Sequence, residues 1–165
     1  MKGPGKKFEE DFQKSAAKEM FIYRLKDPPQ SFNSGCTGCP KLKTRFSPQN
    51  ICDFIAFGDA TLYLLELKSC KGKSVPFKNI VKNEKDTRLL KMVEAEDKWN
   101  GIYSFILFNF RDVENYTVAI SASKVLNFIN KDERSSIPIA AGAMGIEIDS
   151  KLSRTRYSYD MRLFK

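Results

Sequence analysis

The chain has 165 residues, of which 42% are hydrophobic and 13 are phenylalanine. This composition predicts one globular domain over residues 1–165 and excludes a disordered basic protein. The net charge of +8 and the pI of about 9.3 favour a polyanionic partner, although a basic pI can also serve solubility alone. No run of about 18 apolar residues is present, so we expect no membrane span.

The N-terminus and the histidine content exclude further classes. Residues 2–11 are highly charged and lack the apolar segment of a secretory signal, so we expect a cytoplasmic protein whose four cysteines are reduced. The chain contains no histidine, which excludes every mechanism with a histidine general base. Carboxylates, lysine and metal-bound water remain as catalytic groups.

Residues 5–24 are expected to form the first helix. Phe8, Phe12, Ala16 and Met20 recur at every fourth position and form one apolar stripe. Glu9 and its acidic neighbours would sit in the first turn, where carboxylates complement the helix dipole. That structural role is one interpretation of Glu9, and a ligand role is the other.

Residues 27–49 carry the turn-forming residues of a long irregular loop, which is typical of a functional segment. Lys41, Lys43 and Arg45 are candidates for phosphate contacts, and ordinary solvated charge is the alternative. Cys36 and Cys39 have the spacing of half a zinc site, which needs two further ligands. Cys52 and Cys70 are expected to face opposite sides of a hairpin, so we do not expect structural zinc.

The stretch NICDFIAFGDATLYLLELKSC, residues 50–70, predicts two apolar strands joined by a tight Gly58-Asp59 turn. With that turn, Phe57 lies opposite Ala60, and Asp53 and Glu66 become diagonal neighbours on one face. Lys68 projects from the same face. Charge in a buried strand is costly unless it is paired or binds a metal. We therefore expect a divalent-cation site with an ammonium group beside it; a hairpin with solvated charges is the alternative, which the apolar LYLLELK run disfavours.

The rest of the chain alternates helices and strands. A basic turn at residues 70–73 precedes a helix over 83–99, in the most basic region of the chain. Strands follow at 102–110 and 116–122, then a short helix from about Ser123, a strand near 144–148 and a basic tail. Trp99, Tyr103 and the phenylalanines of 105–110 are expected in the core. This order predicts an α/β fold with a mixed central β-sheet flanked by helices.

Several short segments resemble a known family. Asp53, the hairpin and Glu66-x-Lys68 resemble the core of the PD-(D/E)XK nucleases, and the flanking segments resemble RecU-like Holliday junction resolvases. These segments are Gly5-Lys6-Lys7-Phe8-Glu9, SVPFKNI at residues 74–80 and RSSIP at residues 134–138. Gly3-Pro4 replaces the Asn-Arg that the family has before the glycine. Asn83 and Glu84 replace its Gln-His in the second helix.

The resemblance implies a restriction-endonuclease-like fold and a homodimeric, Mg²⁺-dependent Holliday junction resolvase, with Mn²⁺ as a substitute ion, in a bacterial or phage-infected cell. It implies Asp53, Glu66, the Leu67 carbonyl and Glu9 as metal ligands, Lys68 as a further catalytic group, and residues 27–49 as a stalk that enters the junction. Candidate DNA contacts are Lys41, Lys43, Arg45, Lys71, Lys73, Lys78, Lys82 and Arg134. A related restriction or repair nuclease, and a non-catalytic DNA-binding protein, are the alternatives.

Overall fold

The computed structural model describes residues 3–26, 50–81, 87–131 and 134–164. The helices are α1 (Pro4–Ala16), α2 (Arg88–Lys98) and α3 (Ala122–Lys131), with short 3-10 helices η1 (Phe77–Asn79), η2 (Ile139–Met144) and η3 (Arg162–Phe164). The strands are β1 (Phe21–Arg24), β2 (Phe54–Gly58), β3 (Thr61–Cys70), β4 (Ser74–Pro76), β5 (Ile102–Phe110), β6 (Tyr116–Ser121), β7 (Ser136–Pro138), β8 (Ile146–Glu147), β9 (Ser150–Ser153) and β10 (Arg156–Tyr159).

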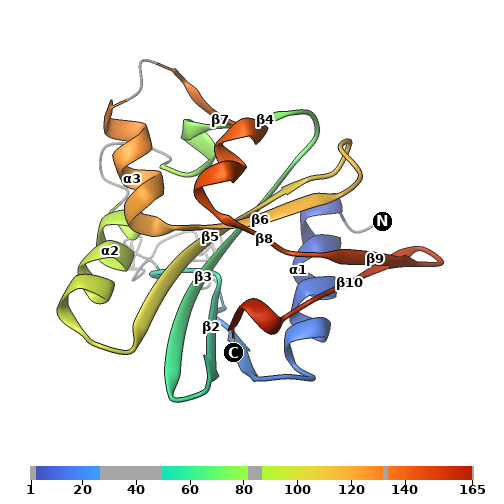
Figure 1. Cartoon of the computed structure of the whole chain (residues 1–165), viewed down its shortest axis with the longest axis horizontal. Coiled ribbons are helices and arrows are strands. Elements are labelled where there is room, and N and C mark those ends of the chain that lie inside the picture. The colour runs from blue at the N-terminus through green and yellow to red at the C-terminus, as the bar shows by residue number, and fades with distance from the viewer. Residues whose placement is uncertain (1–2, 27–49, 82–86, 132–133, 165) are drawn as a thin grey trace, which may run out of the picture.

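The fold is α/β with a mixed central sheet between layers of helices, as the sequence predicted. Six strands follow the order β1-β2-β3-β5-β6-β8, in which β3 and β5 are parallel and the other neighbours are antiparallel. Helix α1 and the β9–β10 hairpin cover one face, and α2 and α3 cover the other (Figure 1). Helix α2 forms the crossover that the parallel β3–β5 pair requires. In the part of the chain that the structure describes, no helix is long and apolar enough to cross a membrane.

Each face of the sheet has its own apolar core. Phe8 and Phe12 of α1 pack on Phe54 and Leu65, together with Phe164 near the C-terminus. On the other face the buried side chains of α2 and α3 pack on the second side of β3, β5 and β6; they are Leu89, Met92, Ala122 and Val125. Alternation along β3 sends Leu65 and Leu67 to the α1 face, and Leu64, Glu66 and Lys68 to the α2 face.

The turn of the β2–β3 hairpin lies one residue later in the sequence than predicted. Gly58 pairs with Thr61, so the two turn residues are Asp59 and Ala60, both with positive φ, at 46° and 58°. Gly58 is the last residue of β2 and lies against Met20. This moves the pairing by two positions along β3, which keeps every side chain on its predicted face.

The expected first helix is too long. α1 ends at Ala16, and residues 21–24 form β1, which pairs antiparallel with β2 along the edge of the sheet. Its sequence, FIYR, is rich in β-formers, and pairing with β2 outweighs the helical spacing of Met20. Because α1 begins at Pro4, its first turn contains no acidic residue, and the helix-dipole interpretation of Glu9 is wrong.

The later elements agree more closely. β5 has the predicted bounds, and β6 and α3 differ by one residue at their boundary. Of the predicted helix 83–99, the structure describes 87–99 and places α2 at 88–98. The predicted strand near 144–148 is reduced to β8 after η2, and the basic tail forms the β9–β10 hairpin and η3. Trp99 and Tyr103 are 57% and 48% exposed, so their assignment to the core is wrong.

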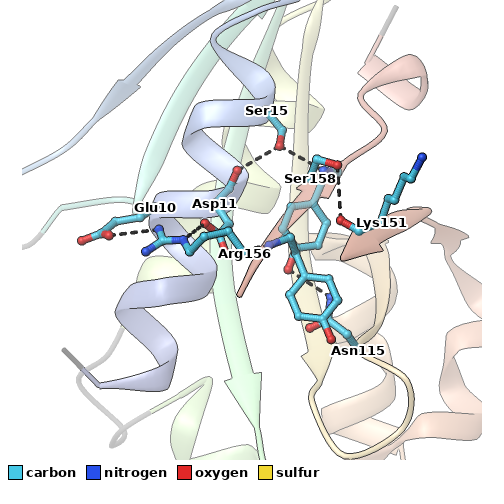
Figure 2. Close-up of polar contacts among 9 residues, drawn as sticks. Glu10, Asp11, Ser15, Asn115, Lys151, Arg156 and Ser158 are labelled. Carbon is cyan, nitrogen blue, oxygen red and sulfur yellow. Dashed lines mark hydrogen bonds and ion pairs between the residues drawn. The ribbon is translucent and has the colours of Figure 1, made fainter. Parts of the chain in front are cut away.

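The buried carboxylate of Asp11 connects α1 to the C-terminal β9–β10 hairpin (Figure 2). Asp11 accepts hydrogen bonds from Nε of Arg156 at 2.5 Å and from the backbone N–H of Tyr157 at 3.1 Å. One turn later, Ser15 Oγ accepts the Tyr159 N–H at 2.9 Å. Glu10 contacts the same guanidinium at 3.2 Å but remains partly exposed.

Replacing the buried Asp11 by alanine is expected to lower the free energy of unfolding by about 2–3 kcal/mol, because a partly buried backbone donor and a partly buried cation lose their acceptor. Urea unfolding followed by circular dichroism measures this change. Glu10→Gln is the matched control, because it alters the neighbouring, more exposed contact to Arg156 and should have a much smaller effect. Equal losses in the two variants would contradict the assignment.

Candidate active site

Two carboxylates face each other across the β2–β3 hairpin. Asp53 immediately precedes β2, and its N–H donates to the Leu65 carbonyl at 3.1 Å. Continuing the Phe54–Leu65 register by one position places Asp53 directly opposite Glu66. The prediction that they share a face is therefore confirmed, and the predicted diagonal offset is wrong. Oδ2 of Asp53 also accepts the Leu67 N–H at 2.8 Å, which orients the carboxylate toward β3.

Glu66 is buried in the middle of β3, with 4% of its surface exposed. Its Oε1 contacts two cations, Nζ of Lys68 at 2.6 Å and a guanidinium nitrogen of Arg88 at 3.2 Å. Among the described residues, its Oε2 is buried without a hydrogen-bond partner. A buried carboxylate oxygen normally has a donor or a cation, so this oxygen has the environment of an unfilled ligand.

Proximity of the two carboxylates alters the protonation of Asp53. Burial, followed by the negative charge of Glu66, raises the pKa of Asp53 to about 6 from an ordinary value of 3.8. The Leu67 N–H and Lys68 oppose the rise without cancelling it. Asp53 is thus held in a setting that disfavours its charged form unless another cation arrives.

This pKa predicts a pH dependence for the stability of the metal-free protein. Between about pH 4 and pH 6 the folded state keeps the Asp53 proton that the unfolded state has lost, so the free energy of unfolding falls as the pH rises. The difference between the two pKa values sets a ceiling of about 3 kcal/mol for this loss. Urea unfolding in a chelator, compared between wild type and Asp53→Asn at pH 4 and pH 7, measures it. The variant should gain stability relative to wild type at pH 7, and a difference that does not change with pH would refute the assignment.

Glu9 stands apart from this pair. Its Oε2 forms an ion pair with Arg24 of β1 at 2.6 Å, although its charge still contributes to the raised pKa of Asp53. Across the described ranges, no three His, Cys, Asp or Glu side chains lie close enough to form a metal-binding group. The structure therefore does not assemble the three-carboxylate site expected with Glu9. Cys52 and Cys70 are buried free thiols.

The pair has the chemistry of a site for a hard divalent cation. Carboxylate oxygens are the ligands that Mg²⁺ and Mn²⁺ prefer, and one or two protein carboxylates commonly suffice for Mg²⁺. The orphaned Oε2 of Glu66 and the disfavoured charge on Asp53 both fit such an ion. Asp53 and Glu66 are the residues that could hold it, and Leu67 is fixed beside them through its N–H.

The basic residues predicted to contact DNA divide into two groups. Lys71, Lys73, Lys78 and Arg134 are exposed, and the last three lie on two segments that the structure brings together. Strand β4 pairs with β7, with Val75 opposite Ile137, and Phe77 N–H donates to the Ser135 carbonyl at 2.9 Å. Outside the described residues lie Lys41, Lys43, Arg45 and Lys82, and also Cys36 and Cys39.

Sequence reasoning missed two arginines that contact the predicted site residues. Arg88 contacts Glu66, and Arg24 holds Glu9. The expected helix over residues 5–24 concealed the strand that carries Arg24, and the expected helix over 83–99 placed Arg88 inside a helix rather than at its first residue. A basic first residue is unusual for a helix, but α2 had to be known to begin at 88 before that signal could be used.

Comparison with known proteins relates most of the chain to a bacterial prophage protein. No protein-family model matches the chain. The SPbeta prophage-derived uncharacterized protein YotM of Bacillus subtilis (strain 168) is 32% identical over 170 residues, which cover 94% of this chain and 81% of YotM. The chain therefore belongs to the same family as YotM.

Proposed function

We propose that this protein is a metal-dependent endonuclease that cleaves phosphodiester bonds in branched DNA, as a RecU-like Holliday junction resolvase does. The observation that carries the proposal is the pair of Asp53 and the buried Glu66; within the described ranges, one Glu66 oxygen lacks a hydrogen-bond partner and the other contacts two cations at 2.6 and 3.2 Å. Buried carboxylates beside a lysine suit hydrolysis at a phosphodiester, where negative charge develops and needs both a metal and a fixed cation.

The architecture supports this assignment. A restriction-endonuclease-like fold has a mixed central sheet between helices, with the hairpin of Asp and Glu-x-Lys inside it. Here Asp53 precedes β2, Glu66 and Lys68 lie on β3, and α2 crosses over to the parallel β5. Both sides of the hairpin are covered by helices, which fixes the carboxylates on rigid elements.

The carboxylates and the lysine would have separate tasks. Asp53 and Glu66 would hold one Mg²⁺ or Mn²⁺ ion, and Glu9 would support the site from outside. When bound, the ion would lower the pKa of water and stabilise charge on the phosphate. Lys68 extends from the same face of β3 as Glu66, where its ammonium group would orient a water or neutralise the reacting phosphate.

The basic surface supports nucleic acid as the substrate. Two of the three segments that resemble the resolvases, 74–80 and 134–138, pair through β4 and β7, although they are distant in sequence. Exposed Lys73, Lys78 and Arg134 lie on or beside this pair. We expect it to bind the DNA backbone, together with Lys41, Lys43, Arg45, Lys71 and Lys82. Since a four-way junction needs two symmetric cuts, a homodimer is the working form.

Cleavage of a synthetic four-way junction beside a sequence-matched linear duplex, with Mg²⁺ and with a chelator, tests the proposal. We expect Mg²⁺-dependent, paired cuts in the junction and little cleavage of the duplex. Equal cleavage of both substrates would indicate a related restriction or repair nuclease. Tight binding with no cleavage in Mg²⁺ or Mn²⁺ would indicate a non-catalytic DNA-binding protein and would refute the enzyme assignment.

A further inference from the structure

Arg88 is the first residue of α2, and its position is unusual for a cation. The N-terminus of a helix carries the positive end of the helix dipole, which favours acidic side chains. The Arg88 side chain is nevertheless only 14% exposed and directs a guanidinium nitrogen to Oε1 of Glu66 at 3.2 Å. Contact with a buried carboxylate therefore compensates for an otherwise unfavourable placement.

The same oxygen is shared by a second, closer cation. Lys68, two residues along the same strand, contacts Oε1 at 2.6 Å. The site thus brings together two carboxylates, Asp53 and Glu66, and two cations, Lys68 and Arg88, and the formal charges of these four side chains sum to zero. A divalent ion held by the carboxylates would leave an excess of about two positive charges, which matches an entering phosphodiester and the anion that attacks it.

Of the two cations, Arg88 is better placed to leave Glu66. Its contact is longer, it comes from a different element than the carboxylate, and its planar fork can bind two phosphate oxygens at once. Once Glu66 is neutralised by a metal, the largely buried guanidinium of Arg88 is repelled by that metal, and its attraction to Glu66 is weakened.

We propose that Arg88 is a phosphate-binding residue that the metal releases: it pairs with Glu66 in the metal-free protein and binds the scissile phosphate once the carboxylates hold a divalent cation. This inference rests on the proposed function. It predicts that Arg88 opposes metal binding in the absence of DNA and supports DNA binding only in the presence of metal. A residue that merely orients Glu66 would do neither.

The first test measures Mn²⁺ binding to the full chain without DNA, by electron paramagnetic resonance of the free ion. Arg88→Gln should bind Mn²⁺ roughly tenfold more tightly than wild type, since a cation near the ion has been removed. Arg88→Lys should stay near wild type. Lys91→Gln is the matched control, because it removes an exposed charge from the same helix and should change little. Unchanged or weaker Mn²⁺ binding in Arg88→Gln would overturn the proposal.

The second test measures junction binding in Ca²⁺ and in a chelator, with cleavage checked on the same samples. Arg88→Gln should lose roughly tenfold in affinity in Ca²⁺ and little in chelator, where Arg88 is engaged by Glu66. Arg88→Lys should recover part of the Ca²⁺-dependent gain. An equal loss in both conditions would make Arg88 a general phosphate contact and overturn its release by metal. Failure of the wild type to cleave any DNA would refute the nuclease assignment, while the Mn²⁺ comparison would still decide whether Arg88 competes for Glu66.

Discussion

Asp53→Asn is expected to lower the rate of DNA cleavage by at least about a thousandfold while leaving junction binding intact. The change removes one of two metal-binding charges with almost no change in shape, and the asparagine oxygen can still accept the Leu67 N–H that now binds Oδ2 at 2.8 Å. Glu66→Gln should have the same effect on cleavage. In a chelator, Asp53→Asn should bind DNA slightly more tightly, because a carboxylate near a phosphate is repulsive.

Asp59→Asn provides the matched control for this prediction. Asp59 is an exposed turn residue of the same hairpin, with φ of 46°, a conformation that asparagine also tolerates. Asp59→Asn removes the same negative charge from a residue that, like Asp53, directly adjoins β2, but this residue is outside the carboxylate pair. Single-turnover cleavage of a four-way junction should therefore be unchanged in Asp59→Asn and absent in Asp53→Asn. Retained cleavage in Asp53→Asn would remove the basis of the proposed site.

The hairpin illustrates what sequence patterns can and cannot specify. Alternation of apolar residues placed Asp53, Glu66 and Lys68 on one face, because a buried strand tolerates only one assignment of faces. The register within that face was wrong by two positions, since such a shift leaves the hydrophobic pattern unchanged. Only the residue types of the turn could then fix the register, and they favoured Gly58 rather than Ala60 as a turn residue. In the structure Ala60 is the turn residue, with a φ of 58°.

Errors in the N-terminal region had a different cause. The apolar stripe Phe8, Phe12 and Ala16 correctly identified the buried face of α1, but Met20 continued the spacing past the end of the helix. Residues 21–24 become a strand through pairing with β2, a contact across a long stretch of sequence that no local pattern contains. The Glu9–Arg24 ion pair depends on that strand, so the isolation of Glu9 from the carboxylate pair could not be predicted.

Lys68→Ala is expected to slow the chemical step by about a hundredfold or more, the usual effect of removing a fixed electrostatic stabiliser. The reason lies in its position: the ammonium group contacts Oε1 of Glu66 at 2.6 Å and is held on the same rigid strand. Loss of metal would not explain a slower reaction, because removing a cation next to Glu66 should strengthen Mn²⁺ binding, as in Arg88→Gln.

Single-turnover cleavage at saturating protein and Mg²⁺, with junction affinity measured in Ca²⁺, separates the roles of the two cations. Lys68→Ala should show a large loss in the cleavage rate and nearly normal affinity, whereas Arg88→Gln should lose affinity that depends on metal. Lys14→Ala, which removes an exposed lysine from α1, should resemble wild type in both measurements. A Lys68→Ala protein that cleaves at the wild-type rate would show that the ammonium group only neutralises Glu66 in the metal-free fold, and the lysine would then have no part in the reaction.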